Sequence, residues 1–146
     1  MKAIASRLTA LVCGLLLVPA ALAQTEIKLG HVGEPGSLFQ KSADEFARRA
    51  NAKLGGKAKV VTYGSSQLGG DSEMIQKLKL GTIDMALPST VMSSQVDLFG
   101  VFEMPYIVKN RQHMAKIEKE LFWTKLAPEA EKKGLKVLAV WENGER

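Results

Sequence analysis

The residue of this 146-residue chain whose type and position best suit it to bind a ligand is Arg146. It ends the segment Glu142-Asn143-Gly144-Glu145-Arg146, which follows an apolar run. A guanidinium just past the carboxyl end of a strand can donate two parallel hydrogen bonds to a carboxylate. A solvated or salt-bridged surface arginine is the alternative interpretation.

The two histidines, His31 and His113, lie on different predicted elements. Neither has a carboxylate at the spacing typical of metal ligands, so the sequence nominates no metal site. His113 follows Asn110-Arg111-Gln112 and is interpreted as a solvated helix residue. His31 ends a strand beside a loop, where it either contacts a ligand or is buried with its ring hydrogen-bonded.

The glycine-rich segment from Gly64 to Asp71 has part of the spacing of a phosphate-binding loop. Gly64 and Gly69 fit G-x-x-x-x-G, but Gly70 and Asp71 stand where a lysine and a Ser or Thr are required. We therefore interpret the segment as a strand-to-helix turn. The single cysteine, Cys13, lies in the leading segment and no G-x-S-x-G motif occurs, so the sequence nominates no nucleophile and no cofactor.

Residues 1–23 have the organisation of a secretory signal peptide. Lys2 and Arg7 precede the apolar run Leu8 to Val18, and Ala21-Leu22-Ala23 follows as a small-x-small cleavage site. The run is well short of the roughly 20 residues that a transmembrane helix needs. An uncleaved anchor or a buried first helix is the alternative. We expect export, a mature domain of residues 24–146, and no membrane insertion once the signal is removed.

The composition is that of a globular protein, with 46% hydrophobic residues and a formal net charge of +5. Lys2 and Arg7 contribute part of that charge and belong to the predicted signal. The remaining positive charge is too small to favour a nucleic-acid partner, which export also disfavours.

Hydrophobic periodicity predicts four strands that alternate with three helices. The expected strands are Glu26–Val32, Ala58–Tyr63, Ile83–Leu87 and Leu135–Trp141. This alternation predicts an α/β fold with a parallel sheet. Ligands of such sheets bind beyond the carboxyl ends of the strands, here residues 31–36, 64–71, 88–94 and 141–146.

The helix ends carry recognisable signals. In the first helix, Ser37 is expected to cap the N-terminus with Gln40 reaching back, and Gly55-Gly56 to end the helix. The second helix is expected to be capped by Asp71 or Ser72 and to end at Gly81. The third is expected to run from near Asn110 to Gly134, with a kink or a restart at Pro128.

The stretch from Ser65 to Met74, SSQLGGDSEM, and the stretch from Leu80 to Ala86, LGTIDMA, resemble the solute-binding proteins of TRAP transporters, the DctP family. Three further stretches agree with the resemblance: residues 27–32, residues 98–106 and residues 134–146. The match therefore covers nearly the whole predicted mature chain.

The resemblance implies a periplasmic binding protein-like fold in which two lobes trap an organic acid in a cleft. This chain corresponds to the first lobe, so we expect an N-terminal fragment that lacks the second lobe. The family's principal carboxylate-binding arginine lies in a later segment that is absent here. Ser89 stands where some members hold an acidic residue. The positions that match ligand-facing positions of the family are Arg146, Ser89, Met92, His31, Val32 and Gly70.

The resemblance further implies a non-enzymatic periplasmic receptor that passes a small carboxylate to TRAP membrane permease subunits. Two other hypotheses stay open on the residues alone. One is an exported ligand-sensing domain, and the other is an exported enzyme with a dispersed catalytic site.

Overall fold

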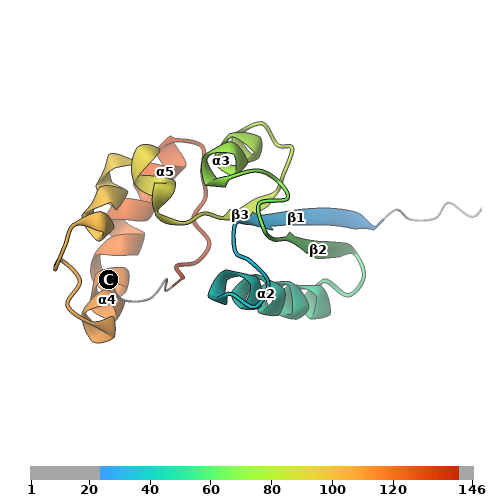
Figure 1. Ribbon diagram of the computed structural model, residues 1–146, viewed down its shortest axis with the longest axis horizontal. Helices are drawn as coiled ribbons and strands as arrows, with labels where there is room; N and C mark the ends of the chain where they lie inside the picture. Colours follow the sequence, from blue (N-terminus) through green and yellow to red (C-terminus); the bar gives the residue numbers. More distant parts are fainter. Residues whose placement is uncertain (1–23, 142–146) are drawn as a thin grey trace, which may run out of the picture.

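Figure 1 shows the computed structural model of the chain, which describes residues 24–141, apart from the side chain of Thr90. The predicted signal peptide, residues 1–23, and the segment 142–146 with the candidate site residue Arg146 lie outside the described residues.

The described chain has a sheet unit followed by a helical segment. The sheet unit consists of β1 (Thr25–His31), α2 (Leu38–Leu54), β2 (Ala58–Tyr63), α3 (Asp71–Lys79) and β3 (Met85–Leu87). The helical segment consists of the 3₁₀ helices η2 (Thr90–Ser94) and η3 (Asp97–Glu103), then α4 (Arg111–Ile117), the π-helix η4 (Glu118–Leu126) and α5 (Ala127–Lys132).

The three strands form a parallel sheet in the order β2-β1-β3, which confirms the predicted fold class. Residues 25–30 of β1 pair with residues 58–63 of β2, and residues 29–31 pair with residues 85–87 of β3. The third strand is shorter than the predicted Ile83–Leu87. Asp84 replaces part of that pairing, because its Oδ2 accepts from the Lys28 N–H at 2.8 Å.

Successive residues of β1 face opposite sides of the sheet, and each side is covered by one helix. Leu29 packs with Ala43 and Ala47 of α2 in the main core cluster. Gly30 faces α3, where a Cβ on this glycine would lie 2.6 Å from the sulfur of Met74. Figure 1 shows α2 and α3 on opposite sides of the strands, as right-handed crossovers in opposite directions require.

The helix α2 begins and ends largely as its sequence predicts. The Ser37 hydroxyl accepts from the Gln40 N–H at 3.2 Å, and Gly55 adopts the left-handed conformation with φ 55°. The expected reciprocal bond of the capping box is absent from this helix end. The Gln40 side chain donates to Asp44 at 2.7 Å instead, and the Ser37 N–H donates to the Glu34 carbonyl.

The helical segment has its own apolar cluster, centred on Phe122, Leu126 and Ala127. Phe122 meets Phe99 edge to face, with ring centroids 5.7 Å apart and planes at 84°. α4 begins near Asn110 as predicted. Asn110 is its N-cap, because the Asn110 Oδ1 accepts from the His113 N–H at 2.9 Å. The helix continues to Lys132, with α5 starting just before Pro128 and Gly134 following at φ 79°.

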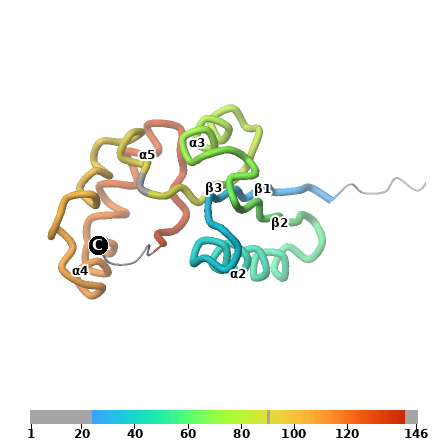
Figure 2. Tube along the Cα trace, viewed as in Figure 1, coloured from blue at the N-terminus to red at the C-terminus, as the bar shows by residue number. Residues whose placement is uncertain are grey.

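The predicted fourth strand, Leu135–Trp141, is wrong: these residues are not paired into the sheet. A strand needs a neighbouring strand to pair its backbone N–H and carbonyl groups, whereas alternating apolar side chains can pack against any apolar surface. Val137 and Val140 pack against the cluster of the helical segment, and Trp141 packs against Phe46 of α2 at a ring distance of 6.4 Å. Figure 2 shows this stretch running back from α5 toward the sheet unit.

Candidate functional site

The candidate site lies at the carboxyl ends of the strands, where the sheet order reverses. β1 connects to β2 on one side, whereas the chain then crosses to β3 on the other. The loops that leave β1 and β3 therefore diverge, although His31 and Leu87 are register partners at the two strand ends. Divergence of neighbouring loops opens the crevice in which parallel α/β sheets bind ligands.

His31 lies at the end of β1 and has no exposed surface. Its Nδ1 accepts a hydrogen bond from the Gly33 N–H at 3.1 Å, whereas its buried Nε2 has no partner among the described residues. Burial lowers the pKa of the ring, and the nearby Asp44 carboxylate opposes this effect. Of the two alternatives for His31, burial describes its side chain, with one ring nitrogen satisfied.

The segment after β2 is a tight turn, as its glycines predict. Ser65 and Ser66 both have positive φ, 48° and 59°. Their N–H groups donate to the carbonyls of Gly33 and His31, at 3.0 and 3.2 Å. The turn is therefore fixed by the loop after β1, and its amides are used within the fold.

The N-terminus of α3 lies beside the exit of β3. Gly70, a candidate site residue, is the exposed N-cap, so the predicted capping by Asp71 or Ser72 is wrong. Asp71 is already inside the helix, and its Oδ2 accepts from the Ser89 N–H at 3.2 Å. The Asp71 carboxylate therefore binds a backbone group 18 residues later in the chain, because the path of the chain after β3 brings the Ser89 N–H within its reach.

Asp71 is the polar group of this edge that sequence reasoning did not single out as a site residue. Its Oδ1 is buried and has no hydrogen-bond partner within residues 24–141, and burial raises the pKa of the carboxyl group, opposed by the Ser89 hydrogen bond. In the sequence, an acidic residue that follows two glycines is equally typical of the start of an ordinary helix, so Asp71 did not stand out as a site residue. Its burial depends on the chain 18 residues later, which no local pattern reveals.

Two further candidate residues follow the carboxyl ends of β1 and β3 in the chain. Val32 follows His31 and is half-buried, and Met92 is half-buried in η2. The Met92 carbonyl accepts from the Gln95 N–H at 3.1 Å, which closes the end of the 3₁₀ helix, and from the Val96 N–H at 2.9 Å. His113, expected to be solvated, is half-buried, and its Nδ1 accepts from the Lys109 N–H at 3.3 Å.

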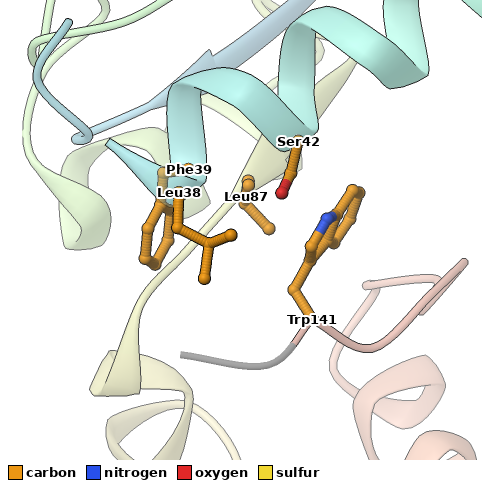
Figure 3. A pocket seen from close by; sticks show the side chains of 5 residues that line it. All are labelled: Leu38, Phe39, Ser42, Leu87 and Trp141. Carbon is orange, nitrogen blue, oxygen red and sulfur yellow. The ribbon is translucent and has the colours of Figure 1, made fainter. Parts of the chain in front are cut away.

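Trp141 reaches the same side of the molecule from the other end of the chain. Figure 3 shows its ring beside Ser42 of α2 and Leu87 at the end of β3, with Leu38 and Phe39 lining the same small pocket. The carboxyl end of β3, the start of α2 and the residue preceding the Glu142–Arg146 motif are thus close in space.

A larger apolar groove lies in the helical segment, away from the strand ends. Its volume is about 370 Å³, and it is lined from three elements, by residues including Leu98, His113, Ile117 and Leu121. Leu98 and Leu121 are about half exposed. The groove offers one imidazole and otherwise apolar surface, which suits packing better than recognition of a polar solute.

Residues 24–141 include no group of three or more His, Asp or Glu side chains arranged to hold a metal ion. In the same part of the chain, no helix has the length and apolar character to cross a bilayer.

The sequence profile of the bacterial extracellular solute-binding proteins of family 7, DctP, matches residues 29–146. The chain belongs to this family. The resemblance in the motifs after β2 and α3 is therefore confirmed. The family and the solved structures similar to this chain are solute-binding receptors.

One similar curated protein is the C4-dicarboxylate-binding periplasmic protein DctP of Rhodobacter capsulatus. It is 34% identical over 131 residues, which are 88% of this chain and 39% of that protein. The chain thus spans about two fifths of the length of this relative.

Two solved structures share the fold. The TRAP periplasmic solute-binding protein of Sulfurospirillum deleyianum with bound succinate is 34% identical, with a TM-score of 0.71 over 77% of this chain and 36% of that one. The sugar acid binding protein DctPAm of Advenella mimigardefordensis in complex with galactonate is 30% identical, with a TM-score of 0.78 over 83% of this chain and 39% of that one.

Proposed function

We propose that this chain contributes the first lobe of a periplasmic receptor that captures a small carboxylate for a TRAP membrane permease. The observation that carries the proposal is the combination of family membership with the acids bound by similar receptors, succinate and galactonate. Closure of a second lobe over the acid would favour the form that the permease accepts.

The carboxylate of the ligand is proposed to lie near Arg146, whose planar guanidinium can donate two parallel hydrogen bonds. Trp141 supports this placement, because it lies beside Leu87 at the end of β3 and only a few residues before Arg146. Ser89 and Gly70 are proposed to supply polar contacts from the loops around α3, with Val32 and Met92 beside them.

Binding is tested by titrating the full-length protein with succinate and with galactonate, using thermal shift and calorimetry. A ligand that binds only the folded state raises the melting temperature as its concentration rises. If neither these acids nor a wider panel of carboxylates changes the melting temperature, the proposal fails.

The role of Arg146 is tested with Arg146→Lys, which keeps the charge and loses the paired hydrogen bonds. We expect the affinity for the acid to fall about tenfold or more. Arg49→Lys on α2, whose side chain is 72% exposed, is the matched control and should bind as the wild type. Equal affinity of both variants would make Arg146 an ordinary surface arginine.

We further propose that residues 1–23 direct export and are then removed. Expression in a bacterial host should give a periplasmic protein whose first residue, by mass spectrometry, is Gln24. Retention of Met1 would contradict this prediction.

A further inference from the structure

The His31 side chain forms a hydrogen bond of the type that asparagine and aspartate form in tight turns. Its Nδ1 accepts from the N–H two residues later, at Gly33. An acceptor in that position fixes the first residues of the loop after β1. The His31 side chain has no exposed surface, so the acceptor of this bond is shielded from water, whereas Gly33 is half-buried.

The same residue also connects the loop after β2. The His31 carbonyl accepts from the Ser66 N–H, and the Gly33 carbonyl accepts from the Ser65 N–H. Ser65 and Ser66 hold positive φ values, which are unfavourable for residues with a side chain. These bonds help keep the two serines in that conformation, so His31 stabilises the loops after β1 and β2 together.

The ring packs closely against the backbone of Gly33 and Gly64. A Cβ on Gly64 would lie 2.8 Å from Cε1 of His31, and a Cβ on Gly33 would lie 3.2 Å from its Nδ1. Because Nδ1 accepts a hydrogen bond, the single hydrogen of the neutral ring is on Nε2. A proton added to Nδ1 would face the Gly33 N–H and remove this bond.

The charged groups around the ring are few. On α2, Asp44 interacts with it electrostatically but is itself held by Gln40 and Thr62 at 2.7 and 2.8 Å. Glu34, in the loop after β1, accepts from the Ser65 hydroxyl. On α3, the first turn carries Asp71 and Glu73. Strand β3 and residues 64–70 contain no ionisable side chain.

Burial therefore decides the state of the ring, because it outweighs Asp44 and lowers the pKa of His31 below 6.5. A pKa that is lower in the folded state favours the neutral ring. The stabilisation by His31 is complete above pH 6.5 and is lost as the pH falls through the pKa of the folded state.

We infer that His31 is a positioning residue of the binding site, whose neutral ring fixes the loops after β1 and β2 and so makes acid binding dependent on pH. The ring itself does not contact the acid. The effect of His31 on acid binding rests on the proposed function, whereas its hydrogen bond to Gly33 is present without a ligand.

The arrangement is tested first without a ligand, by nitrogen-15 NMR of histidine-labelled full-length protein, with His31→Asn used to assign the signal. We expect the neutral form with hydrogen on Nε2. Hydrogen exchange at the Gly33 and Ser66 amides should accelerate at least tenfold, beyond the change at other buried amides, when the ring is protonated. A hydrogen on Nδ1, or exchange at these amides that does not depend on the ring, would overturn the inference.

The consequence is tested with galactonate, an acid that stays ionised over the relevant range, and with succinate at pH 7.5. Wild-type affinity for galactonate should fall by up to tenfold for each pH unit below the pKa of the ring. His31→Asn places an acceptor at the position of Nδ1 and does not titrate. We expect it to bind within threefold of the wild type at pH 7.5 and to lose the pH dependence.

His31→Gln is the matched variant, because its amide lies at the Nε2 position and leaves the Gly33 N–H without an acceptor. We expect about tenfold weaker binding, also independent of pH, with thermal melts confirming that both variants are folded. An affinity of the wild type that is constant from pH 7.5 to 5, or equal binding by the two variants, would overturn the inference. If no acid binds while the NMR and exchange results hold, the proposed function fails and the arrangement of the loops stands.

Discussion

The sheet unit and the helical segment of this chain are held together in different ways. In the sheet unit, side chains bond to backbone groups far along the sequence: Asp84 accepts from the Lys28 N–H across 56 residues, and Gln24 donates to the Gly56 carbonyl across 32 residues. In the helical segment, the corresponding bonds of Asn110 and Thr124 span three or four residues. Its tertiary structure therefore depends mainly on aromatic packing around Phe122.

This difference indicates where binding is positioned. Loops that must hold polar groups in fixed directions need long-range hydrogen bonds. At the carboxyl ends of the strands, the Ser65 N–H donates to the Gly33 carbonyl and the Ser89 N–H to the Asp71 carboxylate. The helical segment has a wide apolar groove and several exposed apolar side chains, including Tyr106 at 95% exposure. Its surface suits packing against apolar partners, whereas the strand ends suit a polar solute.

The largest contrast between the two regions is expected for glycine substitutions. In Gly33→Ala, the new methyl group would lie 2.5 Å from Cβ of Phe39 and 2.6 Å from Oγ of Ser37, and we expect the free energy of unfolding to fall by about 3 kcal/mol. In Gly100→Ala the nearest atom is Cβ of Ser93 at 3.8 Å, so the change should stay within about 0.5 kcal/mol. Urea denaturation measures both, and similar losses would remove the contrast.

Two asparagines test the role of side-chain bonds to backbone. Asn51 bonds both the N–H and the carbonyl of Val60 at the free edge of β2, at 2.7 and 3.0 Å. Asn51→Ala leaves both groups unpaired and should lower the free energy of unfolding by about 2 kcal/mol.

Asn110→Ala removes only the helix cap of α4 and should cost about 1 kcal/mol. The two variants are compared by urea denaturation under the same conditions. A greater loss for Asn110 than for Asn51 would show that the helical segment depends on polar anchors as much as the sheet unit does.

Asp71→Asn is expected to stabilise the protein modestly. The pKa of Asp71 is raised, so the stabilisation associated with its protonated form is complete below pH 3.8 and is lost as the pH rises through the pKa of the folded state. The amide keeps an acceptor for the Ser89 N–H without a buried charge. We expect a gain of about 1 kcal/mol at pH 7 and a smaller gain at pH 4.

The matched control is Asp97→Asn, at the exposed start of η3, which should change stability equally little at both pH values. A loss of stability in Asp71→Asn at pH 7 would show that the helix dipole of α3 outweighs the burial of the carboxylate.

The smallest effect on stability is expected for Leu121→Lys in the apolar groove. Leu121 is 49% exposed, so the free energy of unfolding should change by less than about 0.5 kcal/mol. Self-association, measured by light scattering, should decrease, because the substitution interrupts the exposed apolar surface. Leu80→Lys, at an isolated leucine after α3 that is 76% exposed, should leave self-association unchanged.

The sequence predicted the elements whose signals are local. The Ser37 cap, the left-handed Gly55, the limits of β2 and the start of α4 at Asn110 follow from neighbouring residues, and all four are present. The fold class followed from their alternation. The predicted cap at the start of α3 was wrong: Gly70 is the N-cap, and the Asp71 carboxylate accepts from the Ser89 N–H rather than from an N–H of its own first turn.

Tertiary structure alone decided the features that require a distant partner. Residues 135–141 have the alternation of a strand, yet they cover the cluster around Phe122 instead of joining the sheet. The burial of His31 depends on the close approach of Gly64, which follows β2 in another part of the sequence, and its ring also accepts from the Gly33 N–H. Local sequence determines which backbone conformation is favourable, whereas burial and hydrogen-bond partners depend on which surfaces meet when the chain folds.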